Sequence, residues 1–236
     1  MQLSEFDQKY VCIKTVYGDT ITGLARYQDE DYLRSEWGGA EEGLFVEDFL
    51  IYASQIASIE ETVVHGTAEL WTRQLILRRY RMEDAEPLYR DLGSDPEMVR
   101  YSGWNPYATL EMARDTVRQF MDSYSDEHAY SWIMDIEGVV VGTIGAYDYQ
   151  NDQIEVGYSV IRGWQGRGLA TEALSRVLKY LTENEGISCV TAWCAAENAA
   201  SRRVLEKAGM QFVRMERDGI SVGDKSYDIL HFEYRR

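Results

Sequence analysis

The first sixty residues of the chain alternate apolar and polar side chains in short runs, which is the two-residue period of half-buried β-strands. Such runs cover residues 10–16, 20–27, 44–52 and 56–59, with turn residues at 18–19 and 38–39 between them. A polar stretch follows at residues 60–67. The pattern predicts an all-β module over residues 1–66, with a domain boundary near residues 61–70.

The rest of the chain mixes strand spacing with helical spacing. Helices are predicted at about residues 82–92, 110–123, 169–181 and 198–207, and strands at 75–77, 130–136, 139–147, 154–161, 189–194, 212–217 and 227–234. Residues 94–107 contain Asp95-Pro96 and Asn105-Pro106, so we expect a loop near whatever the domain binds. This order predicts a mixed α+β domain over residues 67–236.

Composition narrows the class of protein. Of the 236 residues, 45% are hydrophobic and the formal net charge is −16, as in a soluble globular chain. The excess of acid counts against binding to DNA or RNA, whose phosphates need basic patches. The sequence has no secretory signal and no membrane-spanning run, which predicts a cytoplasmic protein. Its three cysteines form no C-x-x-C motif, which fits a reducing compartment and predicts that there is no zinc site.

A glycine-rich turn at residues 162–170 stands between a predicted strand and a predicted helix. Glycines there let backbone N–H groups converge on an anion at the positive end of the helix dipole. No Gly-Lys-Ser/Thr closes the turn as in a Walker loop, and Gly166-x-Gly168 lacks the third glycine of a dinucleotide fingerprint. From the glycines alone, a phosphate site and a plain strand-to-helix turn are equally open.

Three motifs together resemble a known family. Gln165-x-x-Gly168-x-Ala170 matches the pyrophosphate loop of the GNAT acetyltransferase superfamily, and Asn198-x-x-Ser201, followed by residues 205–209, is similar to its second signature. The opening of the domain is similar to that of the ribosomal-protein N-acetyltransferase (RimJ/RimL-like) branch, in Thr72-x-x-Leu75-x-Leu77-Arg78 and Glu83-Asp84-Ala85. The resemblance covers about residues 70–236.

This resemblance implies a twisted, mostly antiparallel sheet flanked by helices, and transfer of an acetyl group from acetyl-CoA to a primary amine by direct attack. It also implies the residues that would bind acetyl-CoA. The backbone amides of the turn would hold the pyrophosphate, and the charge of Arg167 and the hydroxyl of Thr171 would assist them. The residues of this pyrophosphate site would be Gln165, Gly166, Arg167, Gly168, Leu169, Ala170 and Thr171. The backbone of Tyr158, Ser159 and Val160 and the Asn198 side chain would contact the pantetheine arm, and Ser201 would lie near the sulfur.

The implied reaction needs a base, because an amine with a pKa of about 10 is mostly protonated at neutral pH, and an acid for the departing thiolate. Glu155 is the candidate base, since it is a carboxylate in an otherwise apolar strand, and burial would raise its pKa. The alternative is an exposed glutamate on the strand face. Ser201 is the candidate acid, and the alternative is an ordinary first-turn serine under an Asn198 N-cap.

Two features of many family members are absent from this sequence. Leu205 stands where a tyrosine acid is common, and no glutamate stands near Trp193. Tyr147 is then an alternative acid from elsewhere in the chain. The departures also keep open a rival function, a catalytically weak acyl-CoA-binding sensor or interaction protein that acts through its N-terminal module.

Several aromatic, cysteine and histidine residues could also be functional, but each has an ordinary structural interpretation. The aromatic residues Trp104, Tyr107, Tyr147, Tyr149 and Trp164 fit either a pocket for a cationic amine or ordinary core and surface positions. Cys189 and Cys194 alternate with apolar positions and are predicted to be core. The three histidines are scattered without ligand spacing, so no metal is expected.

Residues 8–61 resemble a small Sm-like β-barrel, in Val11-x-Ile13, Gly18-Asp19, Ile21-x-Gly23-Leu24 and Ile56-x-x-Ile59-Glu60. Members of that family often bind RNA, but 4 basic and 13 acidic residues give residues 1–66 a net charge of −9, which counts against a phosphate-binding surface. We therefore expect a module for homodimer contacts or protein docking. The acidic chain favours a cationic acceptor: the N-terminus of a basic protein, a polyamine or an aminoglycoside.

Overall fold

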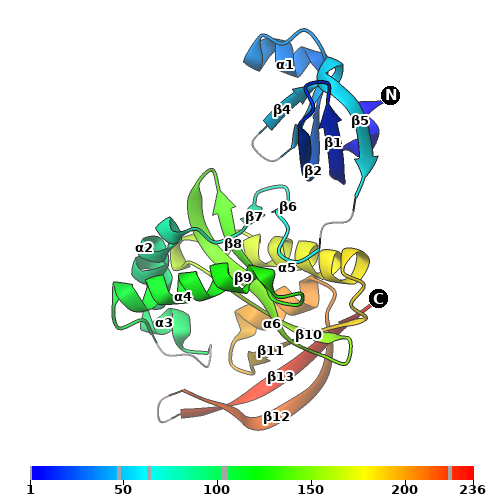
Figure 1. Ribbon diagram of the computed structural model, residues 1–236. Helices are drawn as coiled ribbons and strands as arrows, with labels where there is room; N and C mark the ends of the chain where they lie inside the picture. Colours follow the sequence, from blue (N-terminus) through cyan, green and yellow to red (C-terminus); the bar gives the residue numbers. More distant parts are fainter. Residues whose placement is uncertain (1, 47–48, 63–64, 102–105, 223–224) are drawn as a thin grey trace. The chain divides into compact units, whose positions relative to one another are not determined.

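The computed structural model describes residues 2–46, 49–62, 65–101, 106–222 and 225–236 (Figure 1). The chain divides into two units, Met1–Val64 and His65–Arg236. Each unit has its own sheet, and each is considered by itself.

Five antiparallel strands form the sheet of the first unit, in the order β4-β3-β2-β1-β5. They are β1 (Tyr10–Thr15), β2 (Thr20–Gln28), β3 (Gly43–Val46), β4 (Phe49–Tyr52) and β5 (Ile56–Glu61), with 3-10 turns at Leu3–Phe6 and Ala53–Gln55. Apolar residues of the predicted strands, together with Leu3 from the first 3-10 turn, form the core, which consists of Leu3, Val11, Ile13, Ala25, Leu44, Val46, Ile51 and Ile56. The strand predicted over residues 44–52 is in fact two strands, β3 and β4.

The small closed barrel expected for this unit is not confirmed. Strands β4 and β5 are the two edges of the sheet, and no pairing between them is found in the described residues of the unit. The sequence reasoning also missed helix α1 (Glu30–Trp37), because Leu33 is its single buried residue and the helical spacing is weak. The residues at the two ends of α1 could have indicated the helix. Asp29 is the N-cap and accepts a hydrogen bond from the Tyr32 amide at 2.8 Å, and Gly38 ends the helix with a left-handed φ of 69°.

The second unit contains an eight-stranded sheet in the order β12-β13-β11-β10-β9-β8-β7-β6. Its strands are β6 (Leu70–Trp71), β7 (Ile76–Arg78), β8 (Tyr130–Ile136), β9 (Val139–Gln150), β10 (Gln153–Val160), β11 (Cys189–Ala195), β12 (Gln211–Val222) and β13 (Lys225–Arg235). Neighbouring strands are antiparallel except β10 and β11, which are parallel. The mostly antiparallel sheet is confirmed; β6 was missed because two residues show no period.

Helices cover both faces of this sheet (Figure 1). They are α2 (Ala85–Leu88), α3 (Pro96–Val99), α4 (Leu110–Asp122), α5 (Leu169–Lys179) and α6 (Ala199–Lys207), with 3-10 or π turns at Met82–Asp84, Tyr89–Gly93, Ser123–Ser125, Arg162–Trp164 and Tyr180–Asn184. Helix α3 falls in the segment that the sequence predicts as a loop. None of the helices in the described ranges is long and apolar enough to cross a membrane.

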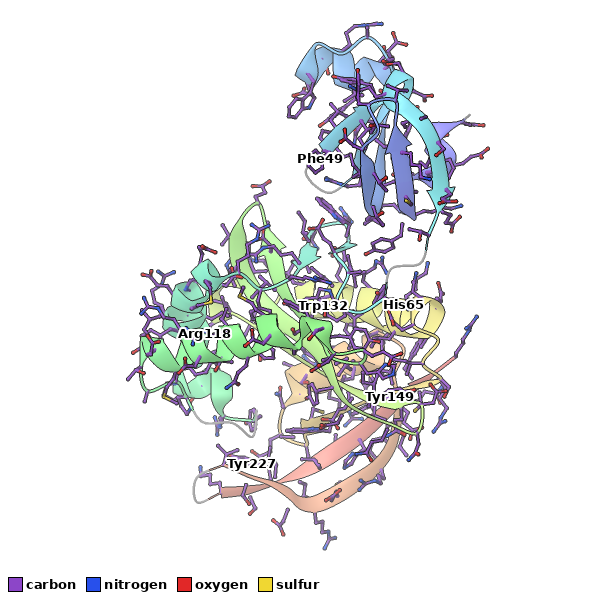
Figure 2. All side chains as sticks on the ribbon, viewed as in Figure 1. Phe49, His65, Arg118, Trp132, Tyr149 and Tyr227 are labelled. Carbon is purple, nitrogen blue, oxygen red and sulfur yellow. The ribbon has the colours of Figure 1, made fainter. Side chains whose placement is uncertain are left out.

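Two neighbouring residues of β8 show how the helices are divided between the faces. Ile133 packs into a cluster with Leu88 of α2 and Val117 of α4. Trp132, which Figure 2 labels within the second unit, is fully buried and contacts the Tyr180 ring just after α5, with ring centroids 6.1 Å apart. Because successive strand residues point to opposite faces, α2 and α4 lie on one face and the end of α5 on the other.

A buried ion cluster joins β7 to the start of α2. The Arg78 guanidinium donates to both oxygens of Asp84 at 2.8 and 2.9 Å, and to Asp135 of β8 at 2.8 Å. The two carboxylates also accept from the amides of Arg81 and Gly138. The three charged side chains are at most 10% exposed, so they satisfy one another where water does not reach. The opening motif of the domain therefore has a structural role.

Candidate active site

Strands β10 and β11 lie side by side for only part of their length. Three pairs join them: Gln153 with Cys189, Ile154 with Val190, and Glu155 with Thr191. Beyond these pairs, β10 follows β9 as far as Val160, and β11 follows β13 as far as Ala195. The two strands therefore part at Glu155, in the middle of the sheet.

Alternate residues of β10 direct their backbone groups toward the parted side. Ile161 N donates to Val141 O at 2.9 Å, so this pair is a hydrogen-bonded one in the β9–β10 ladder. Since hydrogen-bonded and non-hydrogen-bonded pairs alternate, Ser159 directs its N–H and C=O to β9, whereas Tyr158 and Val160 direct theirs away from β9. Tyr158 and Val160 thus have backbone groups on the side where the strands part.

The glycine-rich turn leads from β10 into α5 with two residues in the left-handed region, Gly166 (φ 77°) and Gly168 (φ 83°). A side chain at either position would meet nothing within 4 Å, so the backbone, and not crowding, requires glycine there. The first amides of α5, at Leu169, Ala170 and Thr171, have no acceptor within the helix, because no helical carbonyl precedes them. The turn has the geometry of an anion site at the positive end of a helix.

One side chain of the turn attaches it to β10, and another folds back on the turn itself. Gln165 Nε2 donates to Val160 O at 2.9 Å, which links the turn to the end of β10. The Arg167 guanidinium lies 4.6 Å from the centre of the Trp164 ring and donates to Gly163 O at 3.2 Å. The charge of Arg167 is therefore held beside the turn.

Glu155 lies at the point where β10 and β11 part, with its side chain half-buried. Its carboxylate accepts hydrogen bonds from Trp193 Nε1 at 2.9 Å and from the Tyr147 hydroxyl. Burial raises the pKa of Glu155, the two hydrogen bonds oppose that rise, and the charge of Asp148 adds to it, so that the pKa lies above its ordinary value. A carboxylate shifted in this direction is better suited to accept a proton near neutral pH.

Asn198 and Ser201 meet at the start of α6. The Asn198 side-chain oxygen accepts from the Ser201 amide at 3.1 Å, so Asn198 is the N-cap of this helix. Ser201 Oγ lies 2.9 Å from the Tyr158 hydroxyl, which is also 3.2 Å from Ser201 O. Burial raises the pKa of Tyr158, so the phenol keeps its proton at neutral pH. Tyr158 thereby connects β10 with α6.

The described part of the segment between α2 and α4 contacts both the glycine-rich turn and β13. Asp95 forms an ion pair with Arg162 at 2.6 Å. The Tyr101 ring packs edge-on against Tyr227 of β13, labelled in Figure 2, with centroids 5.3 Å apart. Trp104 lies outside the described residues. Asp95 thus attaches the segment to the turn, and Tyr101 attaches it to the last hairpin.

Residues 74–211, more than half of the chain, match the family model described as the acetyltransferase (GNAT) domain. The chain belongs to the GNAT acetyltransferase family. The uncharacterized N-acetyltransferase p20 of Bacillus licheniformis is 29% identical over 167 residues, which are 69% of this chain and 93% of p20. The uncharacterized N-acetyltransferase YoaA of Bacillus subtilis (strain 168) is 31% identical over 146 residues, 60% of this chain and 82% of YoaA.

A solved GNAT structure shows the same fold. RimL, the ribosomal L7/L12 alpha-N-protein acetyltransferase in complex with coenzyme A, matches with a TM-score of 0.66 at 15% identity, over 71% of this chain and 97% of RimL. The family and the fold predicted from the three sequence motifs are therefore confirmed, and the protein is an N-acetyltransferase of the GNAT family.

Sequence reasoning missed two partners of the candidate catalytic residues in this GNAT chain. Trp193 was noted only as the neighbourhood of an absent glutamate, yet its indole donates to Glu155. Tyr158 was expected to act through its backbone, yet its hydroxyl contacts Ser201. Both contacts join residues about 40 positions apart in the sequence, so no local sequence pattern predicts them.

The other candidates of the GNAT chain have ordinary surroundings. Cys189 and Cys194 are buried in β11, as predicted, and burial raises the pKa of the Cys194 thiol to about 11, which keeps it protonated. Tyr149 stacks on His128 with ring centroids 3.7 Å apart. Tyr107 is half-buried, and this burial raises its pKa. Within the described ranges, no group of three or more His, Cys, Asp or Glu side chains is arranged to hold a metal ion.

Proposed function

We propose that this N-acetyltransferase transfers the acetyl group of acetyl-CoA to a primary amine by direct attack, with Glu155 as the base. The observation that supports this most is the parting of β10 and β11 at Glu155, where a carboxylate with a raised pKa stands on a strand whose later residues, Tyr158 and Val160, direct backbone groups away from β9. Acetyl-CoA, when bound, supplies the activated acetyl thioester. The protein supplies the orientation and the proton transfers.

The residues that would hold acetyl-CoA are the two features that flank the parted strands. The amides of Gly166 to Thr171 fit a pyrophosphate, because the left-handed glycines leave the start of α5 open to an anion. Tyr158 and Val160, on either side of Ser159, offer backbone groups to an extended arm in the manner of an added strand. The complex of the RimL neighbour with coenzyme A agrees with a site of this kind in the shared fold.

Proton transfer is assigned to two side chains. The ammonium form of the acceptor must lose a proton before attack, and Glu155 would take it, directly or through water. The departing thiolate must gain a proton, which we assign to the Ser201 hydroxyl at the start of α6. The Tyr158 hydroxyl, 2.9 Å away, fixes the position of Ser201 Oγ.

The acceptor we propose is cationic: the N-terminus of a basic protein, a polyamine or an aminoglycoside. Two observations support this class. The chain has a net charge of −16, and the charge of Asp148 adds to the negative potential at Glu155, so a cationic acceptor would be attracted to the site. We further propose that residues 67–236 carry the activity and that residues 1–66 are a module for protein docking or homodimer contacts, since its sheet has two free edges in the described part.

Thermal unfolding with and without acetyl-CoA tests the binding step. A ligand at 100 times its Kd stabilises the native state by about 2.7 kcal/mol, which raises the unfolding temperature measurably. Absence of any shift at millimolar acetyl-CoA would contradict the site.

Thiol release with an amine panel then tests the transfer. The panel contains spermidine, kanamycin, a basic peptide with a free N-terminus and butylamine. Glu155→Gln should retain the acetyl-CoA shift and lose about 10²- to 10⁴-fold in turnover. Weaker acetyl-CoA binding by Glu155→Gln would count against its assignment as base, and a thermal shift without turnover on any amine would favour the acyl-CoA sensor.

A further inference from the structure

Two neighbouring strands hold the carboxylate of Glu155. Tyr147 of β9 stands directly opposite Glu155 in the antiparallel register, and its hydroxyl acts as a hydrogen-bond donor that lowers the pKa of the carboxylate. Trp193 of β11 donates from the other side, with Nε1 2.9 Å from Oε1. A carboxylate with two such donors has a fixed orientation, because rotation would break a charge-assisted hydrogen bond. The contacts therefore decide which of its lone pairs remain open to an incoming N–H.

Gly157 explains how the Tyr147 hydroxyl reaches this position. A Cβ atom at residue 157 would lie 2.7 Å from Tyr147 Oη, whereas Cε1 and Cζ of the same ring would be 3.5 Å away. The conflict is thus with the oxygen alone. Gly157 does not have a positive φ, so its backbone conformation is open to other residues. A side chain at residue 157 would therefore have to displace the Tyr147 hydroxyl.

We propose that Tyr147 is a positioning residue that orients Glu155 for proton transfer, and that residue 157 is glycine to admit the Tyr147 hydroxyl. The proposal rests on the proposed function, in which Glu155 is the base. Tyr147 is 44% exposed, yet it acts as a hydrogen-bond donor and keeps its proton, because partial burial of its hydroxyl and the charge of the neighbouring Glu155 raise its pKa. The proton of the amine goes to Glu155, and none leaves Tyr147.

The indole N–H of Trp193 offers a test that needs no turnover. Its resonance in a ¹H–¹⁵N correlation spectrum follows the protonation of the carboxylate to which it donates. His231 pairs with Trp193 and its charge lowers the pKa of Glu155, so the titrations are run in a His231→Gln background. The chain has six tryptophans, and the peak lost in Trp193→Phe gives the assignment. Tyr147→Phe removes a bond that stabilises the ionised carboxylate, so we expect the midpoint of the Trp193 titration to move to higher pH.

Tyr234→Phe is the matched control for this titration. Tyr234 pairs with Val190, which pairs with Ile154, so it belongs to the opposite face of the sheet from Glu155. Its variant should keep the wild-type midpoint. A wild-type midpoint in Tyr147→Phe would overturn the proposal.

Turnover in a double-mutant cycle tests the link to Gly157. Tyr147→Phe and Gly157→Ala should each lower kcat about tenfold and leave the KM for acetyl-CoA unchanged. A tenfold loss is the effect expected when one hydrogen bond to a charged group is removed. The double variant should be no slower than Tyr147→Phe, because phenylalanine has no oxygen for the added methyl group to meet. A roughly 100-fold loss in the double variant would refute the link. If the wild type has no turnover on any amine, the proposed function is wrong. The Trp193 titration would then still show whether Tyr147 donates a hydrogen bond to Glu155.

Discussion

Gly168 and Gly163 belong to the same turn, yet alanine should have opposite effects at the two positions. Gly168 has φ 83° and ψ −1°, in the left-handed region, whereas Gly163 is not among the glycines with positive φ. A Cβ atom at either position would meet nothing within 4 Å. The comparison therefore isolates the backbone conformation, with no steric contribution from neighbours.

The size of the difference follows from these angles. A residue with a Cβ atom costs about 1–2 kcal/mol in the left-handed region, so Gly168→Ala should destabilise the native state by that amount. Gly163→Ala should stabilise by about 0.4–1 kcal/mol, because alanine restricts the unfolded chain at a position whose conformation it tolerates. For a unit of this size, 1 kcal/mol shifts the unfolding temperature by about 2–4 °C, which gives a gap of about 3–12 °C between the variants.

Calorimetric or circular-dichroism melting of the wild type and both variants measures the gap. Gly166→Ala, at φ 77°, is a second member of the left-handed class and should fall with Gly168→Ala. Equal melting temperatures for Gly163→Ala and Gly168→Ala would refute the assignment of the turn's backbone. The same samples with acetyl-CoA show whether the strained variants also bind it more weakly.

Three further outcomes are expected. Arg78→Met should destabilise by about 3–5 kcal/mol in chemical denaturation, because Asp84 and Asp135 lose their buried partner; adding Asp84→Asn and Asp135→Asn should restore most of this loss. Glu155→Gln should have a higher melting temperature than the wild type at pH 8 and the same melting temperature at pH 4. The pKa of Glu155 is higher in the folded than in the unfolded protein, so the protonated side chain contributes stability at low pH, and this contribution is lost as the pH rises through the folded pKa. Asn198→Ala should cost about 1 kcal/mol in denaturant titration through loss of the N-cap of α6, and an unchanged midpoint would show that the cap contributes nothing.

Most of the helices and strands could be predicted from local sequence patterns. The apolar spacing of α4 and α5, the apolar run of β8 and the left-handed Gly209 after α6 all act within a few residues, and each could be predicted from the sequence. The glycine-rich turn is local in the same sense. Elements defined by such short-range causes were predicted with small errors in their bounds.

Contacts between strands could not be predicted in this way. The parting of β10 and β11, and the meeting of Tyr147 and Trp193 around Glu155, depend on the register of three strands that are separate in sequence. The expected barrel failed for a related reason. Alternation predicts strands, but closure depends on whether the edges β4 and β5 meet, and no residue pattern within either strand encodes that.

The short contact between β10 and β11 also has a mechanical consequence. The sheet consists of five strands on one side of this contact and three on the other, and only three residue pairs join the two parts. Every other pair of long strands in the sheet is joined along more of its length. Thermal motion that separates the long strands therefore meets least resistance at this seam, so the proposed catalytic centre lies on the most compliant line between the long strands of the sheet.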